Sequence, residues 1–265
     1  MINSDKSIVA FLDILGYEQW LQRHTPEEAR RAILRHFKAI EEGGEHESSP
    51  FKLFFKSIAI HSLSDSLILV LPESDNLEHA FPGLGKKASR EFSIKNFLGI
   101  VAWIAFHLTS DTKSLIRGAV TFGQYYQHEL NTPANQFVFS KALHKASYLE
   151  RQANMPRIIV EDVIQKDILA PEDVLTFRDE DGQYCLDLYT TSIQTHVASR
   201  ERYLGEITSS LKEQWAALSS MERVRQERIL QKLFWFTNYH NRSIDELFRR
   251  QEITDPARFK IELPV

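Results

Sequence analysis

Each of two apolar runs in this chain has an aspartate at one end, where a predicted strand ends or begins. Residues 7–12 (SIVAFL) are followed by Asp13, and residues 67–71 (LILVL) are preceded by Ser64-Asp65-Ser66. Short apolar runs bounded by turn residues are typical of buried strands. An aspartate at such a boundary either stabilises a turn or holds a cation. For each acid alone the turn is favoured, but if the two strands are neighbours in one sheet, the two carboxylates meet at one edge.

The rest of the chain alternates strands and helices. In order, we expect a strand at 7–12, a helix at 25–43, a hairpin over 51–72, a helix at about 89–108, a strand at 115–122, a helix at 138–152, a strand at 157–161, a second hairpin over 176–189, and helices from about 199 to 250. This order predicts an α+β fold, in which one sheet with a β-α-β-β-α-β core carries helices packed on it, followed by a helical C-terminal extension.

Composition and charge exclude several classes of protein. The net charge of −4 lacks the basic excess that a nucleic-acid polymer would require. A single cysteine, Cys185, excludes an intramolecular disulfide and a thiolate zinc cage. Residues 92–108 are apolar, but they include Lys95 and fall short of the ~20 residues of a membrane-spanning helix. No signal peptide is evident at residues 1–11 (MINSDKSIVAF), so we expect a cytoplasmic protein without membrane association.

A pair of aspartates suits one kind of chemistry well. Mg²⁺ and Mn²⁺ prefer oxygen ligands and take few of them from the protein, while substrate phosphates supply others. Two carboxylates beside a triphosphate are what a two-metal phosphoryl-transfer site requires. Asp13 and Asp65 are therefore candidate metal ligands and catalytic residues.

The segments around these acids resemble a known family. FLDILGY (11–17) followed by LSDSLILVL (63–71) resembles the class III nucleotidyl cyclases, and the closest resemblance within them is to the pyrimidine cyclases of the Pycsar bacterial anti-phage systems. Three more segments support it: IRGAVTFG (116–123), KALHKASYLE (141–150) and KLFWFTNYHN (232–241). Together with the two acidic motifs, they span most of the chain.

The resemblance implies a cyclase catalytic domain at 1–195, with a helical extension at 196–265 packed on it or on the dimer partner. It implies a head-to-tail homodimer with active sites at the interface. Asp13, Asp65 and the backbone carbonyl of Ile14 would bind two divalent ions, Mn²⁺ or Mg²⁺. The activity would be cyclisation of a nucleoside triphosphate to its 3′,5′-cyclic monophosphate with release of pyrophosphate. This product would act on a separately encoded effector in anti-phage defence.

Two departures from the purine cyclases indicate the base. The base-selecting lysine of purine cyclases, four residues before the second acid, is His61 here, and their base-selecting aspartate falls near Phe137. Neither residue can read adenine in the usual way, and a smaller base would leave room for Phe137 or Tyr148. The resemblance therefore favours UTP as substrate and cyclic UMP as product, with CTP as the alternative.

A third departure concerns the transition state. Purine cyclases carry an asparagine and an arginine where this chain has His144 and Tyr148, so the usual transition-state arginine is missing. Another cation could supply the charge, and Arg117 is the candidate, although a surface ion pair explains Arg117 as well. Otherwise the chain is a catalytically degenerate, nucleotide-binding regulatory domain.

Overall fold

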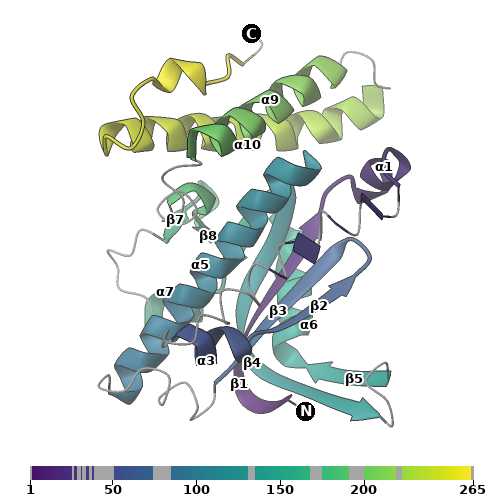
Figure 1. The fold of residues 1–265 in the computed structure, drawn as a ribbon, viewed down its shortest axis with the longest axis vertical. Helices are drawn as coiled ribbons and strands as arrows, with labels where there is room; N and C mark the ends of the chain where they lie inside the picture. The colour runs from purple at the N-terminus through teal and green to yellow at the C-terminus, as the bar shows by residue number, and fades with distance from the viewer. Residues whose placement is uncertain are drawn as a thin grey trace.

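The computed structural model describes residues 2–25, 27, 28, 31, 34, 35, 38, 51–73, 85–130, 135–167, 175–190, 200–218 and 223–263 (Figure 1). Its strands are β1 (Ile2–Ile14), β2 (Ala59–Leu63), β3 (Ser66–Pro72), β4 (Ile116–Leu130), β5 (Asn135–Ser140), β6 (Ile158–Val160), β7 (Thr176–Arg178) and β8 (Tyr184–Leu186). Its helices are α1 (Tyr17–Gln22), α3 (Phe51–Lys56), α5 (Lys86–Thr112), α6 (Lys141–Ala153), α7 (Asp162–Asp167), α9 (Arg200–Leu218), α10 (Arg223–Arg249) and the short 3₁₀ helix η2 (Pro256–Arg258). The predicted α+β class and the β-α-β-β-α-β order of the core are confirmed.

The strands form one mixed sheet with β1 near its centre. The strand order is β2-β3-β1-β4-β6-β8-β7, and β5 pairs with β4 outside this path. Among the strands that the structure describes, all pairings are antiparallel except the parallel pair β4–β6. Since β1 lies between β3 and β4 and both of its faces are covered, its sequence is apolar throughout 8–12.

The two faces of the sheet carry different helices. Ile8, Ala10 and Leu12 point into the main core beneath α5, whereas Val9 and Phe11 point to the face on which α6 packs. This alternation follows from the two-residue period of a strand. Helix α5 is apolar enough to raise the question of a membrane span, but two thirds of its most apolar window is buried inside the protein. The predicted helix at about 89–108 is therefore confirmed, and most of its residues pack inside the protein.

Two local predictions need correction. The segment at 51–56 is helix α3 and not a strand, so the hairpin begins only at Ala59. Phe51, Phe54 and Phe55 have the i, i+3, i+4 spacing of one helix face, and Phe54 is fully buried. In addition, β4 continues beyond Gly123 and pairs with β5, a strand that the sequence did not predict.

The helix predicted at 25–43 lies largely outside the described residues, but its start is visible. The amide of Thr25 donates to Glu28 Oε2 at 2.8 Å, and the amide of Glu28 donates to Thr25 Oγ1 at 3.3 Å. These two reciprocal bonds form a capping box, which is typical of a helix start.

Helices α9 and α10 lie across the end of the sheet where β1 ends (Figure 1). Leu204 of α9 and Leu233 of α10 belong to the same buried cluster as Ile14 at the end of β1. The helical extension thus shares the core of the sheet. The predicted boundary between residues 195 and 196 lies outside the described residues and stays a prediction.

Candidate active site

Asp13 and Asp65 converge at one edge of the sheet. Asp13 is the cross-strand partner of Ser66, and Ser64-Asp65 form the two-residue turn between β2 and β3. The amide of Ile14 donates to the backbone carbonyl of Asp65 at 2.9 Å, which ties the hairpin tip to the end of β1. Residues separated by 52 positions in sequence therefore lie next to each other.

Arg117 faces Asp13 from the neighbouring strand. The two residues are cross-strand partners in β4 and β1, and Arg117 Nη2 donates to Asp13 Oδ2 at 3.2 Å. The Nε side of the same guanidinium forms an ion pair with Glu150 of α6. Arg117 therefore bridges two carboxylates, and its side chain is 19% exposed. Arg117 therefore lies on a strand beside Asp13. Its ion pair with Asp13 is half-buried, whereas the alternative considered from the sequence was an ion pair on the surface.

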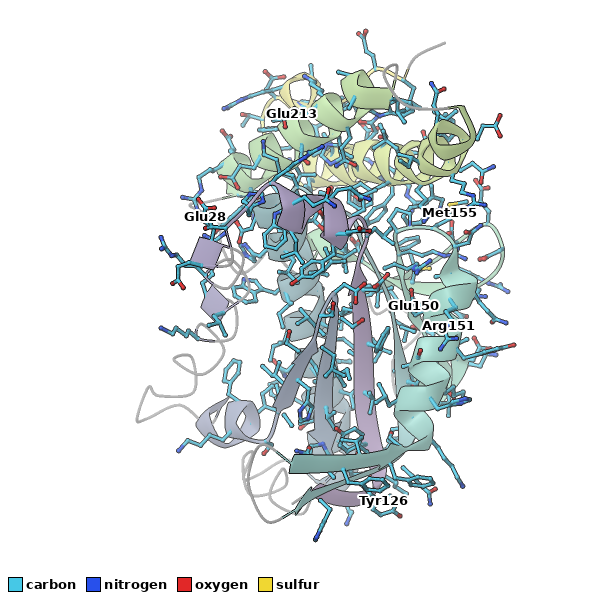
Figure 2. The ribbon with its side chains drawn as sticks, turned by 90° about the vertical axis from the view of Figure 1, so that its right-hand side faces the viewer. Glu28, Tyr126, Glu150, Arg151, Met155 and Glu213 are labelled. Atoms are coloured by element: carbon cyan, nitrogen blue, oxygen red, sulfur yellow. The ribbon has the colours of Figure 1, made fainter. Side chains whose placement is uncertain are left out.

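Glu150 is a site residue that the sequence analysis did not single out. Helix α6 buries Ala142, Ala146, Glu150 and Ala153 against the sheet, which is the spacing of a single helix face. An acid on an otherwise alanine-lined buried face is the signal that could have identified it. Figure 2 shows Glu150 at the end of the sheet nearer to α9 and α10.

A fourth charged group comes from the C-terminal extension. Lys232 of α10 is half-buried, and the charges of Arg117, Asp13 and Glu150 all act on it. Burial, followed by the positive charge of Arg117, lowers the pKa of Lys232. The site thus combines Asp13, Asp65, Glu150, Arg117 and Lys232.

Burial also perturbs the carboxylates. It raises the pKa of Asp13; the Arg117 charge opposes this rise and the Asp65 charge adds to it. Burial likewise raises the pKa of Glu150, again opposed by Arg117. Because both acids cost free energy when ionised here, additional positive charge at this edge would stabilise the site.

The predicted substrate-binding residues are not all at this edge. His61 of β2 lies on the α6 side of the sheet, where its Nε2 is 3.3 Å from the Tyr125 hydroxyl, and burial lowers its pKa. His144 and Tyr148 lie on the exposed side of α6, and Tyr148 is 56% exposed. Substrate binding by His61, His144 and Tyr148 stays a prediction.

Phe137 lies at the opposite end of the sheet within one chain. It pairs with His128 in β4, next to Gln127, which pairs with Ile2 at the start of β1, whereas Asp13 is near the end of β1. Figure 2 shows Tyr126, another residue of this β4–β5 ribbon, far from Glu150. A single chain therefore does not bring Phe137 to Asp13 and Asp65, and contact with their substrate would require a second copy.

The donors at this edge fit a divalent cation shared with phosphates. In the part of the chain that the structure describes, no three His, Cys, Asp or Glu side chains form a group that could hold a metal by themselves. Mg²⁺ and Mn²⁺ sites of substrate-bound enzymes often use only one or two carboxylates, with water and phosphate oxygens completing the shell. Asp13 and Asp65 match that requirement, and the backbone carbonyl of Ile14 as a further ligand stays a prediction.

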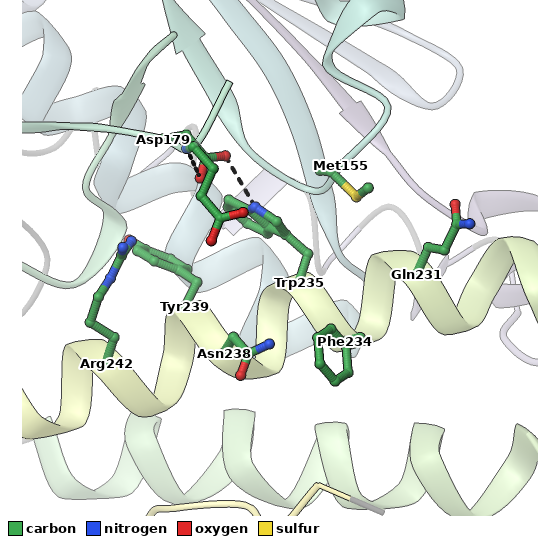
Figure 3. A pocket seen from close by; sticks show the side chains of 9 residues that line it. Met155, Asp179, Gln231, Phe234, Trp235, Asn238, Tyr239 and Arg242 are labelled. Atoms are coloured by element: carbon green, nitrogen blue, oxygen red, sulfur yellow. Dashed lines mark hydrogen bonds between the residues drawn. The ribbon is translucent and has the colours of Figure 1, made fainter. Parts of the chain in front are cut away.

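A separate cleft lies along α10 and includes neither Asp13 nor Asp65 (Figure 3). It has a volume of about 360 Å³ and is lined by Met155, Asp179, Glu180, Gln231, Phe234, Trp235, Asn238, Tyr239 and Arg242. Trp235 Nε1 donates to Asp179 Oδ2 at 3.1 Å across one wall. Phe234 is 49% exposed on this cleft, whereas Phe236 is buried in the core. Phe234 and Phe236, two residues apart on α10, therefore have different surroundings.

No protein-family model matches this chain, and no curated protein matches it in sequence. It is similar to solved nucleotidyl cyclase domains. A dimeric guanylyl cyclase domain of the RhoGC fusion protein from the fungus Blastocladiella emersonii is 11% identical, with 69% of this chain and 94% of that chain covered and a TM-score of 0.46. For the adenylyl cyclase CyaB from P. aeruginosa the identity is 14%, the coverage 71% and 96%, and the TM-score 0.44. Similarity at this level establishes neither the family nor the substrate of this chain. Any assignment of its function therefore depends on the residues at the strand edge.

Proposed function

We propose that this protein is a metal-dependent nucleotide cyclase that converts a pyrimidine nucleoside triphosphate, UTP before CTP, to its 3′,5′-cyclic monophosphate and pyrophosphate. The observation that carries the proposal is the convergence of Asp13 and Asp65 at one strand edge. Two half-buried carboxylates, one with a raised pKa, form a site that favours bound cations.

In this reaction the 3′-oxygen forms a bond to the α-phosphorus. The bond from that phosphorus to the bridging oxygen of the β-phosphate breaks, pyrophosphate leaves, and the hydroxyl proton passes to water. Divalent ions, when bound, lower the pKa of the attacking hydroxyl and neutralise charge on the phosphates. Asp13 and Asp65 would hold these ions, and Arg117 would orient Asp13 through its bond to Oδ2.

The choice of a pyrimidine depends on the resemblance and on His61 and Phe137 in place of the purine-reading residues. A homodimer would be needed to bring a second copy's β5 to the site. Exposed apolar side chains on β5 support this part of the proposal: Phe137 is 59% exposed, and Val138 and Phe139 are 37% and 53% exposed. A role in anti-phage defence through a separate effector belongs to the same proposal.

The test is incubation of the purified protein with each of the four ribonucleoside triphosphates and Mn²⁺, followed by detection of cyclic product. We expect cyclic UMP, or cyclic CMP in second place. Asp65→Ala should abolish turnover and leave folding nearly intact, since a turn acid contributes little packing. Asp255→Ala, at an exposed aspartate before η2, is the matched control and should retain full activity. Normal turnover by Asp65→Ala would refute the ion assignment.

One observation favours a second candidate. The guanidinium of Arg117 already contacts Asp13 and Glu150, which limits its ability to serve as the transition-state cation. A catalytically degenerate domain that binds nucleotide and regulates a partner would have such an arrangement. Absence of product from all four triphosphates, with retained nucleotide binding, would favour this candidate.

A further inference from the structure

The inward face of α10 carries a lysine toward the site. Lys232, Phe236 and Tyr239 have the i, i+4, i+7 spacing of one helix face, and Phe236 and Tyr239 are buried. The Tyr239 hydroxyl accepts from the amide of Leu188 at 2.8 Å and donates to Asp187 Oδ1 at 2.9 Å. These bonds fix the rotation of α10 about its own axis, and α10 lies across the end of the sheet where β1 ends (Figure 1). Buried contacts on the same helix face therefore set the direction in which Lys232 projects.

The ammonium group of Lys232 differs from Arg117 in its contacts. Arg117 is bonded to Asp13 and paired with Glu150. Lys232 is half-buried near the same two carboxylates, yet over the described residues it forms neither a hydrogen bond nor an ion pair. Three N–H donors in a half-buried position are costly unless an acceptor reaches them. The Lys232 ammonium is therefore available to an acceptor from outside the chain.

We propose that Lys232 binds the leaving phosphates of a nucleoside triphosphate held at Asp13 and Asp65, so that the C-terminal helix completes the site. This inference rests on the proposed function. Arg228 lies four residues before Lys232, and its charge acts on that lysine, so the same side of α10 offers a second cation. An ammonium is a compact donor that suits phosphate oxygens without a fixed fork geometry.

The competing explanation is that Lys232 only neutralises the buried Asp13 and Glu150. Under that explanation its removal would change the stability of the fold and would weaken all nucleotides alike. Under the proposal, its removal weakens ligands in proportion to the phosphates they carry beyond the α-phosphate. The number of phosphates on the ligand therefore separates the two explanations.

The experiment measures binding by calorimetry with Mn²⁺ and two probes, 3′-deoxy-UTP, which has no attacking hydroxyl, and 3′-deoxy-UMP. We expect Lys232→Met to weaken the triphosphate about tenfold, as expected for loss of one charge-assisted bond, and the monophosphate less than about twofold. Lys232→Arg should restore triphosphate binding to within about threefold of wild type. Lys212→Met, at an exposed lysine on α9, is the matched control and should bind both probes normally.

A second variant guards against misfolding. Lys232→Gln keeps a polar side chain of similar reach and should show the same loss for the triphosphate, with far-UV circular dichroism unchanged. Equal weakening of both probes, or unchanged binding of the triphosphate by both variants, would overturn the proposal while the cyclase function stands. Failure of the wild-type protein to bind either 3′-deoxy-UTP or 3′-deoxy-CTP would instead overturn the proposed function together with this inference.

Discussion

Replacing Arg117 with methionine is the most informative test of how the site is held together. Arg117 bridges Asp13 and Glu150, whose side chains are 17% and 5% exposed. Removing one partner of a buried ion pair costs about 3–5 kcal/mol, because the remaining charge has no compensation. Asp13 is partly hydrated and Lys232 remains nearby, so we expect a value at the lower end, about 3 kcal/mol.

The assay is urea unfolding at pH 7, followed by tryptophan fluorescence and circular dichroism. Adding Glu150→Leu to Arg117→Met should recover most of the loss, since an apolar pair replaces the ion pair against the alanines of α6. Arg258→Met is the control, because Arg258 pairs with Glu201 in an exposed ion pair and should contribute less than about 1 kcal/mol. An Arg117→Met protein within about 0.5 kcal/mol of wild type would refute this electrostatic description of the site.

The loss in the free energy of unfolding caused by Arg117→Met should also depend on pH. Burial raises the pKa of Asp13 and of Glu150 above their unfolded values, and removal of the Arg117 charge should raise both further. For an acid with a raised folded pKa, the cost of its charge is present above that pKa and disappears as pH falls through it. The stability difference between Arg117→Met and wild type should therefore shrink from pH 7 toward pH 4. A difference that grows over this range would contradict the assignment.

Three further outcomes are expected. Gly118→Ala would place a Cβ 2.5 Å from the Phe11 carbonyl oxygen, so the central strands must separate; we expect a loss of about 1–3 kcal/mol in urea unfolding. Binding of Mn²⁺ should weaken as pH falls through the raised pKa of Asp13, measured by calorimetry at several pH values, and affinity independent of pH would count against that ligand. Tyr239→Phe removes the hydroxyl that donates to Asp187 and should lower the free energy of unfolding by about 1–3 kcal/mol, whereas an unchanged urea midpoint would show that this bond does not anchor α10.

Much of the core could be predicted because its signals are local. The run at 7–12, the turn at Ser64-Asp65 and the Thr25–Glu28 capping box each declare themselves within a few residues. The sequence predicts a strand at 51–56 because a Phe-rich run fits a buried strand as well as one helix face. Packing of this segment against the core favours the helix, and the sequence alone does not reveal that packing.

The charged partners of the site could be predicted less well, because they are long-range contacts. Glu150 meets Arg117 across 33 positions of sequence, and Lys232 lies more than 200 positions from Asp13. No local spacing encodes such pairs. The strand order β3-β1-β4 and the register of its two pairings place Asp13 opposite Arg117 and next to Asp65.

The most direct test of a shared metal site is a count of bound Mn²⁺ by electron paramagnetic resonance, with 3′-deoxy-UTP present. We predict two ions per site in the wild-type protein and a loss of at least one in both Asp13→Asn and Asp65→Asn, with Asp255→Asn unchanged. Equal Mn²⁺ occupancy in the wild-type protein and both site variants would show that these aspartates do not hold the ions.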